Sequence, residues 1–164
     1  MKSDKETALV ELKESIQKRK DWWIFPEELP IRGFMGTGPI FIVGDQPSPS
    51  PWHPGHPNRV AFYSTLKRIG ISNAHLTDIY KKRGKPSMLR EVIPDDFEDH
   101  VNLLRREIEI VNPKRIVALG ELAQKLLIQR VLKRNVNRMW HFHYVVLAGK
   151  ESEYEQNIRE AICD

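Results

Sequence analysis

The sequence predicts an α/β fold of three layers, in which helices cover both faces of a four-stranded, mainly parallel sheet. Short apolar runs rich in β-branched and aromatic residues alternate along the chain with longer segments of helical periodicity. Strands that alternate with helices are joined by right-handed crossovers, which make the strands parallel. The length of 164 residues allows one hydrophobic core. We therefore expect a single domain over 1–164, with an N-terminal helix and aromatic lead-in over 1–37 and an α/β core over 38–162.

The first third of the chain leads into the first strand. Apolar residues at helical spacing predict an amphipathic helix over 4–20, and an aromatic, proline-ended segment over 21–26 is expected to pack on the sheet. The apolar run 40–43, with Gly-Pro before it and Gly-Asp after it, predicts a buried strand. The stretch 47–59 contains five prolines, so we expect a loop there, and its aromatic and histidine residues favour an ordered one.

The remaining elements alternate in type up to the C-terminus. Each predicted helix has apolar residues three and four positions apart, and each predicted strand is a short apolar run. Glycine, proline or asparagine marks several of the boundaries. In order, we expect a helix over 60–69, a strand over 75–79, a helix over 94–111, a strand over 115–120, a helix over 121–132, a strand over 140–147 and a helix over 151–162.

The cysteine content and the hydropathy pattern exclude several classes of protein. Cys163 is the only cysteine, so an internal disulfide, a thiolate zinc site and an iron–sulfur cluster cannot form. No apolar run is as long as a membrane span and residues 1–20 are charged throughout, so we expect a cytoplasmic protein without a signal peptide or membrane anchor. The formal net charge of +4 is compatible with an anionic partner such as DNA or RNA.

Four loops are expected to converge at one edge of the sheet, because the carboxyl ends of parallel strands lie together. Ligands of open α/β sheets bind at that edge. The residues there would form one polar, partly basic cleft. They are Asp45, Gln46, the proline–serine run 47–51, Asp78, residues 81–85, Gly120, Glu121, His141 and His143.

Motifs in these loops resemble those of the uracil-DNA glycosylase superfamily. The family's first motif, a strand followed by Gly-x-(Asp/Asn/Ala)-Pro, is matched by 44–48, and its second, a strand ending in Thr-Asn before basic residues, by 76–81. An Asn-Pro turn into a glycine-ended strand is matched by 112–120, and 141–144 lies where a late His-Pro-Ser loop is expected. The segment 56–59 is similar to the mismatch-specific thymine/uracil branch. The resemblance covers about 38–162 and rests on the order of the motifs.

This resemblance implies a monofunctional DNA glycosylase, a hydrolase of DNA repair that excises uracil or a related damaged base flipped out of DNA. Cleavage of the N-glycosidic bond passes through an oxocarbenium-like state while the base leaves as an anion. A loop residue holds the attacking water, and a histidine or other donor stabilises the leaving base. We expect a monomer that binds single- or double-stranded DNA and uses neither a cofactor nor a metal ion.

The first departure from the family's pattern concerns the residue that holds the water. Gln46 stands where active relatives carry Asp or Asn, and an amide is a poor base. Asp45, one position earlier, matches an acidic residue of the branch with an iron–sulfur cluster and is our first candidate for the water-activating carboxylate. The alternative is an aspartate that caps the turn after the strand.

The second departure is Asp78, which replaces the asparagine that reads uracil. An asparagine amide offers a donor to O4 and an acceptor to N3–H, whereas an ionised aspartate offers only acceptors. We therefore expect uracil to be read poorly and a base with an exocyclic amine to match better. The alternative is a structural aspartate that pairs with Lys81 or Arg83.

The third departure is the missing His-Pro-Ser loop. We align His143 with the family's histidine from its distance to the last helix, with His141 as the alternative. On the strand predicted here, both side chains would lie on the same face.

Other residues are expected to contact nucleic acid. The basic run 81–85 either is solvated or binds phosphate, and Phe62 and Trp52 are either stacking platforms or core residues. Small residues of the proline-stiffened loop would approach the DNA backbone. The predicted nucleic-acid-binding residues are Gly44, Pro47, Ser48, Ser50, Phe62, Asp78, Lys81, Arg83 and Gly120.

Two other functions stay open. A catalytically weak or inactive relative would bind single-stranded nucleic acid, a nucleobase or a nucleotide, and the three departures favour it. A metal hydrolase would use as ligands His53, His56, His141, His143 and Asp45. Prolines around the first two histidines indicate a stiffened loop rather than a metal site.

Overall fold

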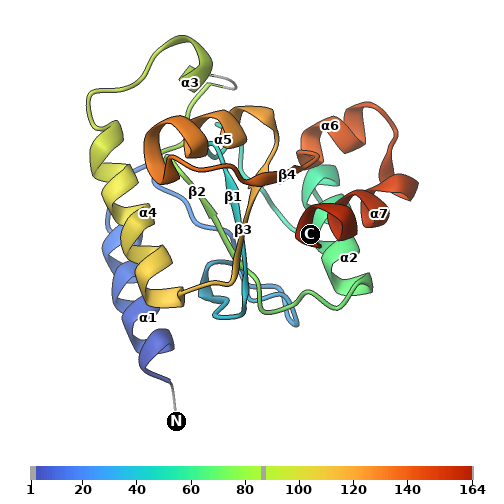
Figure 1. The fold of residues 1–164 in the computed structure, drawn as a ribbon, viewed down its shortest axis with the longest axis horizontal. Helices are drawn as coiled ribbons and strands as arrows, with labels where there is room; N and C mark the ends of the chain where they lie inside the picture. Colours follow the sequence, from blue (N-terminus) through green and yellow to red (C-terminus); the bar gives the residue numbers. More distant parts are fainter. Residues whose placement is uncertain (1–2, 86–87, 164) are drawn as a thin grey trace.

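The computed structural model describes residues 3–85 and 88–163. Its centre is a four-stranded sheet made of β1 (Ile40–Gly44), β2 (His75–Asp78), β3 (Arg115–Leu119) and β4 (Asn137–Met139). The strands lie in the order β2-β1-β3-β4, and every neighbouring pair is parallel. Helices cover both faces of the sheet (Figure 1), which confirms the three-layer α/β prediction.

The helices fall into two layers. One layer consists of α1 (Asp4–Gln17), α4 (Phe97–Val111), α5 (Glu121–Leu126) and its π-helical continuation η2 (Leu127–Leu132). The other consists of α2 (Pro57–Arg68), α6 (Phe142–Leu147) and α7 (Glu151–Ile162). Two short elements, η1 (Gly33–Met35) and α3 (Met88–Glu91), lie in connections. The strands run upward in Figure 1, so their carboxyl ends meet at the upper edge of the sheet.

Each central strand contributes side chains to two cores. Phe41 and Val43 of β1 belong to the core beside α4, and Ile42 belongs to the core beside α2, because successive strand residues point to opposite faces. All three side chains are at most 1% exposed. Burial on both faces explains why the central strands are continuous apolar runs rather than alternating ones.

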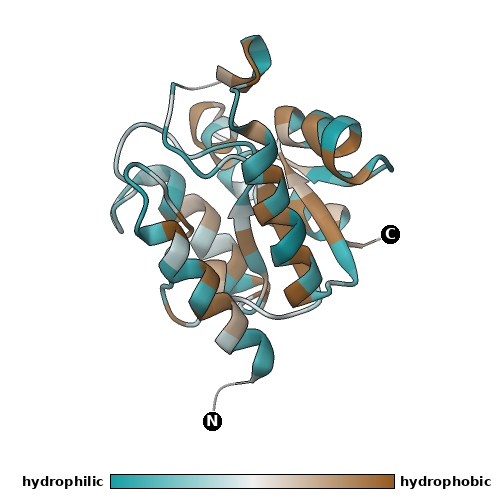
Figure 2. Ribbon diagram, turned by 90° about the vertical axis from the view of Figure 1, so that its left-hand side faces the viewer, coloured by the Kyte–Doolittle hydropathy of each residue, from teal (hydrophilic) through white to brown (hydrophobic). Residues whose placement is uncertain are grey.

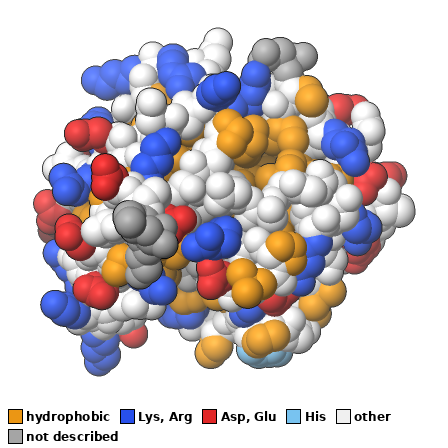
Figure 3. All heavy atoms as spheres, turned by 90° about the horizontal axis from the view of Figure 1, so that it is seen from below, with side chains coloured by type: hydrophobic (Ala, Val, Ile, Leu, Met, Phe, Trp, Pro, Cys, Tyr) orange, Lys and Arg blue, Asp and Glu red, His pale blue; other side chains and the backbone are white. Residues whose placement is uncertain are grey.

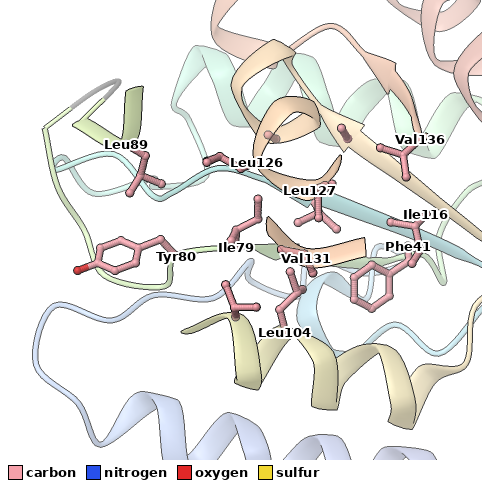
Figure 4. Packing of buried hydrophobic residues seen from close by; sticks show 14 of the residues in the cluster. Phe41, Ile79, Tyr80, Leu89, Leu104, Ile116, Leu126, Leu127, Val131 and Val136 are labelled. Carbon is pink, nitrogen blue, oxygen red and sulfur yellow. The ribbon is translucent and has the colours of Figure 1, made fainter. Parts of the chain in front are cut away.

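The core beside α4 is filled by side chains of this helix, of η2 and of the sheet. Leu104 of α4 lies near Leu127 and Val131 of η2, with Phe41 and Ile116 of the sheet beside them (Figure 4). Burying a side chain of this size stabilises a fold by about 1.5–3 kcal/mol. Hydrophobic and hydrophilic residues alternate along α1 and α4, as expected of helices with one buried side (Figure 2).

The ends of several helices follow from local sequence signals. The Ser3 hydroxyl accepts the backbone N–H of Glu6 at 3.2 Å and starts α1. Pro57 occupies the first turn of α2, where a missing N–H costs nothing. Asn112 ends α4 with a left-handed φ of 50°.

The prediction of a strand over 140–147 is wrong. The fourth strand is Asn137–Met139, and Phe142–Leu147 forms α6. β4 is an edge strand with two exposed polar residues, so it lacks the apolar run that marks the other strands. The His141 ring caps α6, since its Nδ1 accepts the backbone N–H of His143 at 3.1 Å. The two histidines therefore lie at the start of a helix and not on one face of a strand.

The surface at the lower end of the molecule in Figure 1, opposite the carboxyl edge, carries interspersed Lys, Arg, Asp and Glu side chains (Figure 3). Within residues 3–85 and 88–163, no helix combines the length and apolarity that crossing a membrane requires.

Candidate functional site

The loops after β1 and β2 lie side by side at the carboxyl edge of the sheet. Gly44 pairs with Asp78 in the strand register. The backbone N–H groups of Ile79 and Tyr80 donate to the carbonyl oxygens of Gly44 and Asp45 at 2.9 and 3.0 Å. Pairing thus continues past the ends of the strands, and it brings Asp45 close to Asp78 as the cleft prediction requires.

Two glycines allow functional side chains to approach the backbone at this edge. A Cβ atom at Gly44 would overlap Oδ1 of Asp78, so the carboxyl group lies directly over the end of β1. Gly120, after β3, has a φ of 94°, and a Cβ there would lie 3.2 Å from Cβ of His141. Gly44 and Gly120, both predicted as binding residues, are therefore placed at the centre of the candidate site.

Asp78 and Asp45 form a pair of interacting carboxyl groups. Asp78 is 5% exposed, and its burial, followed by the negative charge of Asp45, raises its pKa well above that of a free aspartate. Burial also raises the pKa of Asp45, but the backbone N–H groups of Asp45 and Gln46 favour its charged form. Because the two groups oppose each other's ionisation, Asp78 is the one that retains a proton longer.

A second polar cluster lies behind Asp78 and is fully buried. Lys81 Nζ donates to the backbone oxygen of Asp78 and forms an ion pair with Glu107 Oε2 at 2.8 Å. Glu107 Oε1 lies 3.0 Å from His75 Nε2. Burial alone would raise the pKa of Glu107, but Lys81 and then His75 lower it overall. We call this group the Lys81–Glu107–His75 cluster. In it, the negative charge of Glu107 is balanced by the positive charge of Lys81.

This cluster changes the interpretation of two predicted residues. Lys81 is wholly buried, so the prediction that it contacts nucleic acid does not fit its position. The alternative that Asp78 pairs through its carboxyl group with Lys81 or Arg83 also fails among the described residues. Lys81 contacts the backbone of Asp78 rather than its side chain, and Arg83 donates elsewhere.

Gln46 lies below the surface of the site. It is 9% exposed, and neither its Nε2 nor its Oε1 has a hydrogen-bond partner among the described residues. Its amide is covered by Gly84, where a Cβ would come within 2.7 Å of Gln46 Nε2, and Met88 adjoins the same glycine. An unpaired buried amide costs about 1–3 kcal/mol, so this side chain is held in place by its surroundings and not by its own polar contacts.

His141 is the histidine beside the sheet edge. Burial, followed by the nearby His143, lowers its pKa to about 4, so the ring is neutral at pH 7. Its Nδ1 accepts the backbone N–H of His143, which leaves the proton of the neutral ring on Nε2. His143 is exposed and its Nδ1 lies 3.4 Å from Nδ2 of Asn58. Thus the structure favours His141 over His143 as the oriented donor.

The proline-rich loop after β1 is ordered by two arginines. Arg83 Nη1 donates to the backbone oxygens of Ser48 and Ser50 at 3.0 and 2.9 Å. Further along, Arg59 Nη1 donates to the backbone oxygen of Trp52 at 2.9 Å. Ser48 and Ser50 themselves stay exposed, as does the tip of the loop.

The aromatic candidates for base stacking lie in the core. Phe62 is 0% exposed and Trp52 is 8% exposed. The Trp52 ring meets Trp23 and Phe25 edge-on with ring centroids 5.5 Å apart in both cases. The core alternative therefore fits both Phe62 and Trp52 better than a stacking platform does.

The structure does not assemble the metal site of the hydrolase alternative. In the described part of the chain, no group of three or more His, Cys, Asp or Glu side chains is placed to hold a metal ion. His53 and His56 have ring centroids 5.8 Å apart, and the His56 ring caps α2 by accepting the N–H of Asn58.

Sequence reasoning missed His75 and Glu107, which fix the segment that carries Asp78. A signal for them exists in the chain: His75 begins a buried strand, and Glu107 falls three residues after Leu104 and four before Val111, on the buried side of α4. A charged residue at a core position has a buried partner as a rule, and the structure shows that this partner is Lys81.

The fold and the site define a protein with an acidic, histidine-containing polar site at the carboxyl edge of a parallel sheet. A comparison with models of protein families matches residues 35–162 to the uracil DNA glycosylase superfamily. The match spans most of the chain, so the chain belongs to this superfamily, as the ordered motifs indicate. A search of curated proteins found no matching relative. The similarity to the mismatch-specific branch remains a prediction.

Proposed function

We propose that this protein hydrolyses the N-glycosidic bond of a damaged or deaminated base, uracil or a related one, that is flipped out of DNA. One observation carries the proposal. The Asp45 carboxyl group and the Nε2–H of the neutral His141 belong to loops that meet at the same edge of the sheet, on a chain of the uracil DNA glycosylase superfamily. One group can activate water, and the other can donate to a leaving base.

Asp45 is suited to the role of base. It is partly exposed, the nearby backbone N–H groups of Asp45 and Gln46 favour its charged form, and its raised pKa makes it more basic than a free aspartate once it is ionised. In the proposed step, a water oxygen bonds to the sugar carbon as its bond to the base nitrogen breaks. The bonding electrons leave with the base, and a proton of the water passes to Asp45.

His141 would stabilise the negative charge that the base acquires. A neutral ring with its proton on Nε2 donates a hydrogen bond without first having to lose or gain a proton. A donor placed where charge develops lowers the barrier most when it is fixed before the reaction, and the cap on α6 fixes this ring.

DNA would lie across the proline-rich loop. Ser48 and Ser50 are exposed at its tip, and Lys82 and Lys85 are exposed in the neighbouring loop after β2. The net charge of +4 favours an anionic partner. We further propose that the whole chain acts as one domain on single- or double-stranded DNA.

The test is incubation with single- and double-stranded oligonucleotides that carry uracil, hypoxanthine, xanthine or mismatched thymine, followed by alkali. We expect alkali-labile sites with at least one substrate, and their loss in Asp45→Asn. The exposed Asp95→Asn serves as the matched control and keeps activity. If no substrate is cleaved with the protein in excess, the glycosylase proposal is wrong.

The position of Gln46 favours a second candidate, a relative that binds nucleic acid without cleaving it. The amide that stands at the family's water-holding position lies buried under Gly84 and has no partner among the described residues. In that case, the same oligonucleotides bind with an affinity that falls as salt rises, while none is cleaved.

A further inference from the structure

We propose that Asp78 reads the flipped base as a protonated carboxyl group, one oxygen donating and the other accepting, so that recognition depends on pH and extends to both uracil and cytosine edges. This inference rests on the proposed function, because it assumes that a base enters the site. It concerns the specificity of the site and not the cleavage step.

The placement of Asp78 is the first support. Its carboxyl group lies over Gly44 at the carboxyl edge of the sheet, between the loop that carries Asp45 and the segment anchored by Lys81. Among the described residues, none forms a hydrogen bond or an ion pair with this carboxyl group. A buried, unpartnered polar group beside a candidate reaction centre is free to bind a ligand.

The charges around Asp78 are the second support. Asp45 in the loop after β1 and Glu107 on α4 both disfavour its ionised form, and they add to the effect of burial. Lys81 and Arg83 oppose them, but each cation is engaged elsewhere: Lys81 with Glu107, and Arg83 with the carbonyl oxygens of the proline-rich loop. In the described part of the chain, neither cation forms a hydrogen bond or an ion pair with the Asp78 carboxyl group, so both stabilise its ionised form only from a distance.

A protonated carboxyl group, like an amide, has one hydrogen-bond donor beside one acceptor. Its O–H can donate to O4 of uracil while its carbonyl oxygen accepts from N3–H, as an asparagine would. The prediction that Asp78 offers only acceptors assumed an ionised side chain, and the burial of Asp78 removes that assumption.

The carboxyl group differs from an amide in one respect. When the proton sits on the other oxygen, the carbonyl oxygen can accept from the exocyclic amine of cytosine while the O–H donates to its N3. Only the proton moves between these two arrangements, whereas an amide has to rotate by half a turn. Asp78 can therefore match keto and amino pyrimidines without moving its heavy atoms.

The protonation of Asp78 is measured first, in the free full-length protein. The carbonyl carbon of the Asp78 side chain is followed by nuclear magnetic resonance as pH changes, and the signal is assigned by its absence in Asp78→Asn. We expect a midpoint well above that of a free aspartate, and a lower midpoint in Asp45→Asn, which lacks the neighbouring charge. A carboxylate signal over the whole stable range overturns the inference.

Binding is measured next, about one pH unit below and one above that midpoint. The probes are single strands with one uracil, one cytosine or no base on a fluorinated sugar, which resists cleavage because fluorine destabilises the oxocarbenium state. The protonated fraction falls roughly tenfold between these conditions, so the affinity of the wild-type protein for both bases should fall by roughly tenfold. In Asp78→Asn, the affinity for uracil should change by less than about threefold, because an amide does not titrate.

The possible failures are distinct. If the uracil and cytosine strands bind no tighter than the strand without a base at either pH, the proposed function fails and the inference fails with it. If binding depends on the base but is the same at both pH values in the wild-type protein, the inference alone is overturned. The same holds if Asp78→Asn loses affinity in parallel with the wild-type protein as pH rises.

Discussion

Two sets of polar side chains adjoin each other at the end of β2, the Lys81–Glu107–His75 cluster and the Asp45–Asp78 pair. The charges of the first set are balanced, and those of the second are not. In the Lys81–Glu107–His75 cluster, the Glu107 carboxylate has a partner at each oxygen, at 2.8 and 3.0 Å. In the Asp45–Asp78 pair, the charge of Asp45 disfavours the ionised form of Asp78, and the Asp78 carboxyl group forms no hydrogen bond or ion pair with a described residue. Matched charges support a fold, whereas unmatched ones are tolerated where a ligand completes them.

The largest effect should follow from breaking the matched cluster. Glu107→Ala leaves the Lys81 ammonium buried without its counter-charge, and such a loss costs about 3–5 kcal/mol of unfolding free energy. Denaturant unfolding followed by circular dichroism measures it. Glu109→Ala changes an exposed acid on the same helix and should stay within about 0.5 kcal/mol of the wild-type protein. Equal effects of the two substitutions would show that the cluster is not a matched one.

The opposite pattern is expected at the site, where activity should change more than stability. His141→Asn keeps an acceptor to cap α6 but is too short to replace the Nε2–H donor, so the cleavage rate should fall by about 10²–10³ with little change in unfolding. Single-turnover rates on the best substrate measure the effect. The control is His143→Asn, which alters an exposed neighbour and should cost less than about threefold. A larger loss in His143→Asn would return the role to His143.

A smaller effect should come from displacing Asp78 without changing its chemistry. Gly44→Ala introduces a Cβ where Oδ1 of Asp78 lies, and overpacking of this kind costs about 1–3 kcal/mol. Gly55→Ala is the matched control, because a Cβ there would meet only His53 atoms at ordinary contact distances, the nearest at 3.7 Å. Thermal unfolding compares the two variants, and similar melting temperatures would contradict the placement of Asp78 over β1.

The smallest effect concerns the pH dependence of stability. The pKa of Asp78 is higher in the folded protein than in the unfolded one, so its contribution to stability is complete below the unfolded value of about 4 and is lost as pH rises through the folded value. Asp78→Asn lacks this loss. Its stability relative to the wild-type protein should therefore grow with pH.

Denaturant unfolding at a series of pH values measures this difference. Asp95→Asn makes the same chemical change at an exposed position and serves as the control. A constant difference between Asp78→Asn and the wild-type protein across the series would mean that Asp78 is ionised in the fold.

The alternation of strands and helices along the chain was predictable because strands buried on both faces are short apolar runs between clear boundary signals. Ile40–Gly44 and Arg115–Leu119 show this directly. β4 was missed since an edge strand of three residues carries no such pattern. The apolar residues of the neighbouring helix α6 were predicted as the fourth strand instead. Asp45, Asp78 and Gly44 were predicted at the carboxyl edge from their position at the ends of strands, and the structure places them at that edge. The choice between His141 and His143 and the burial of Lys81 depend on long-range packing, which a single sequence does not record.

The hydrogen bonds from Arg83 to the proline-rich loop affect the electrostatic potential that this loop presents to a polyanion. The carbonyl oxygens of Ser48 and Ser50 belong to peptide bonds with Pro49 and Pro51, which have no N–H group. Since both oxygens accept hydrogen bonds from one guanidinium, its positive charge compensates the negative ends of these carbonyl dipoles. A phosphate chain near this loop would therefore meet less electrostatic repulsion than unpaired carbonyl groups would cause.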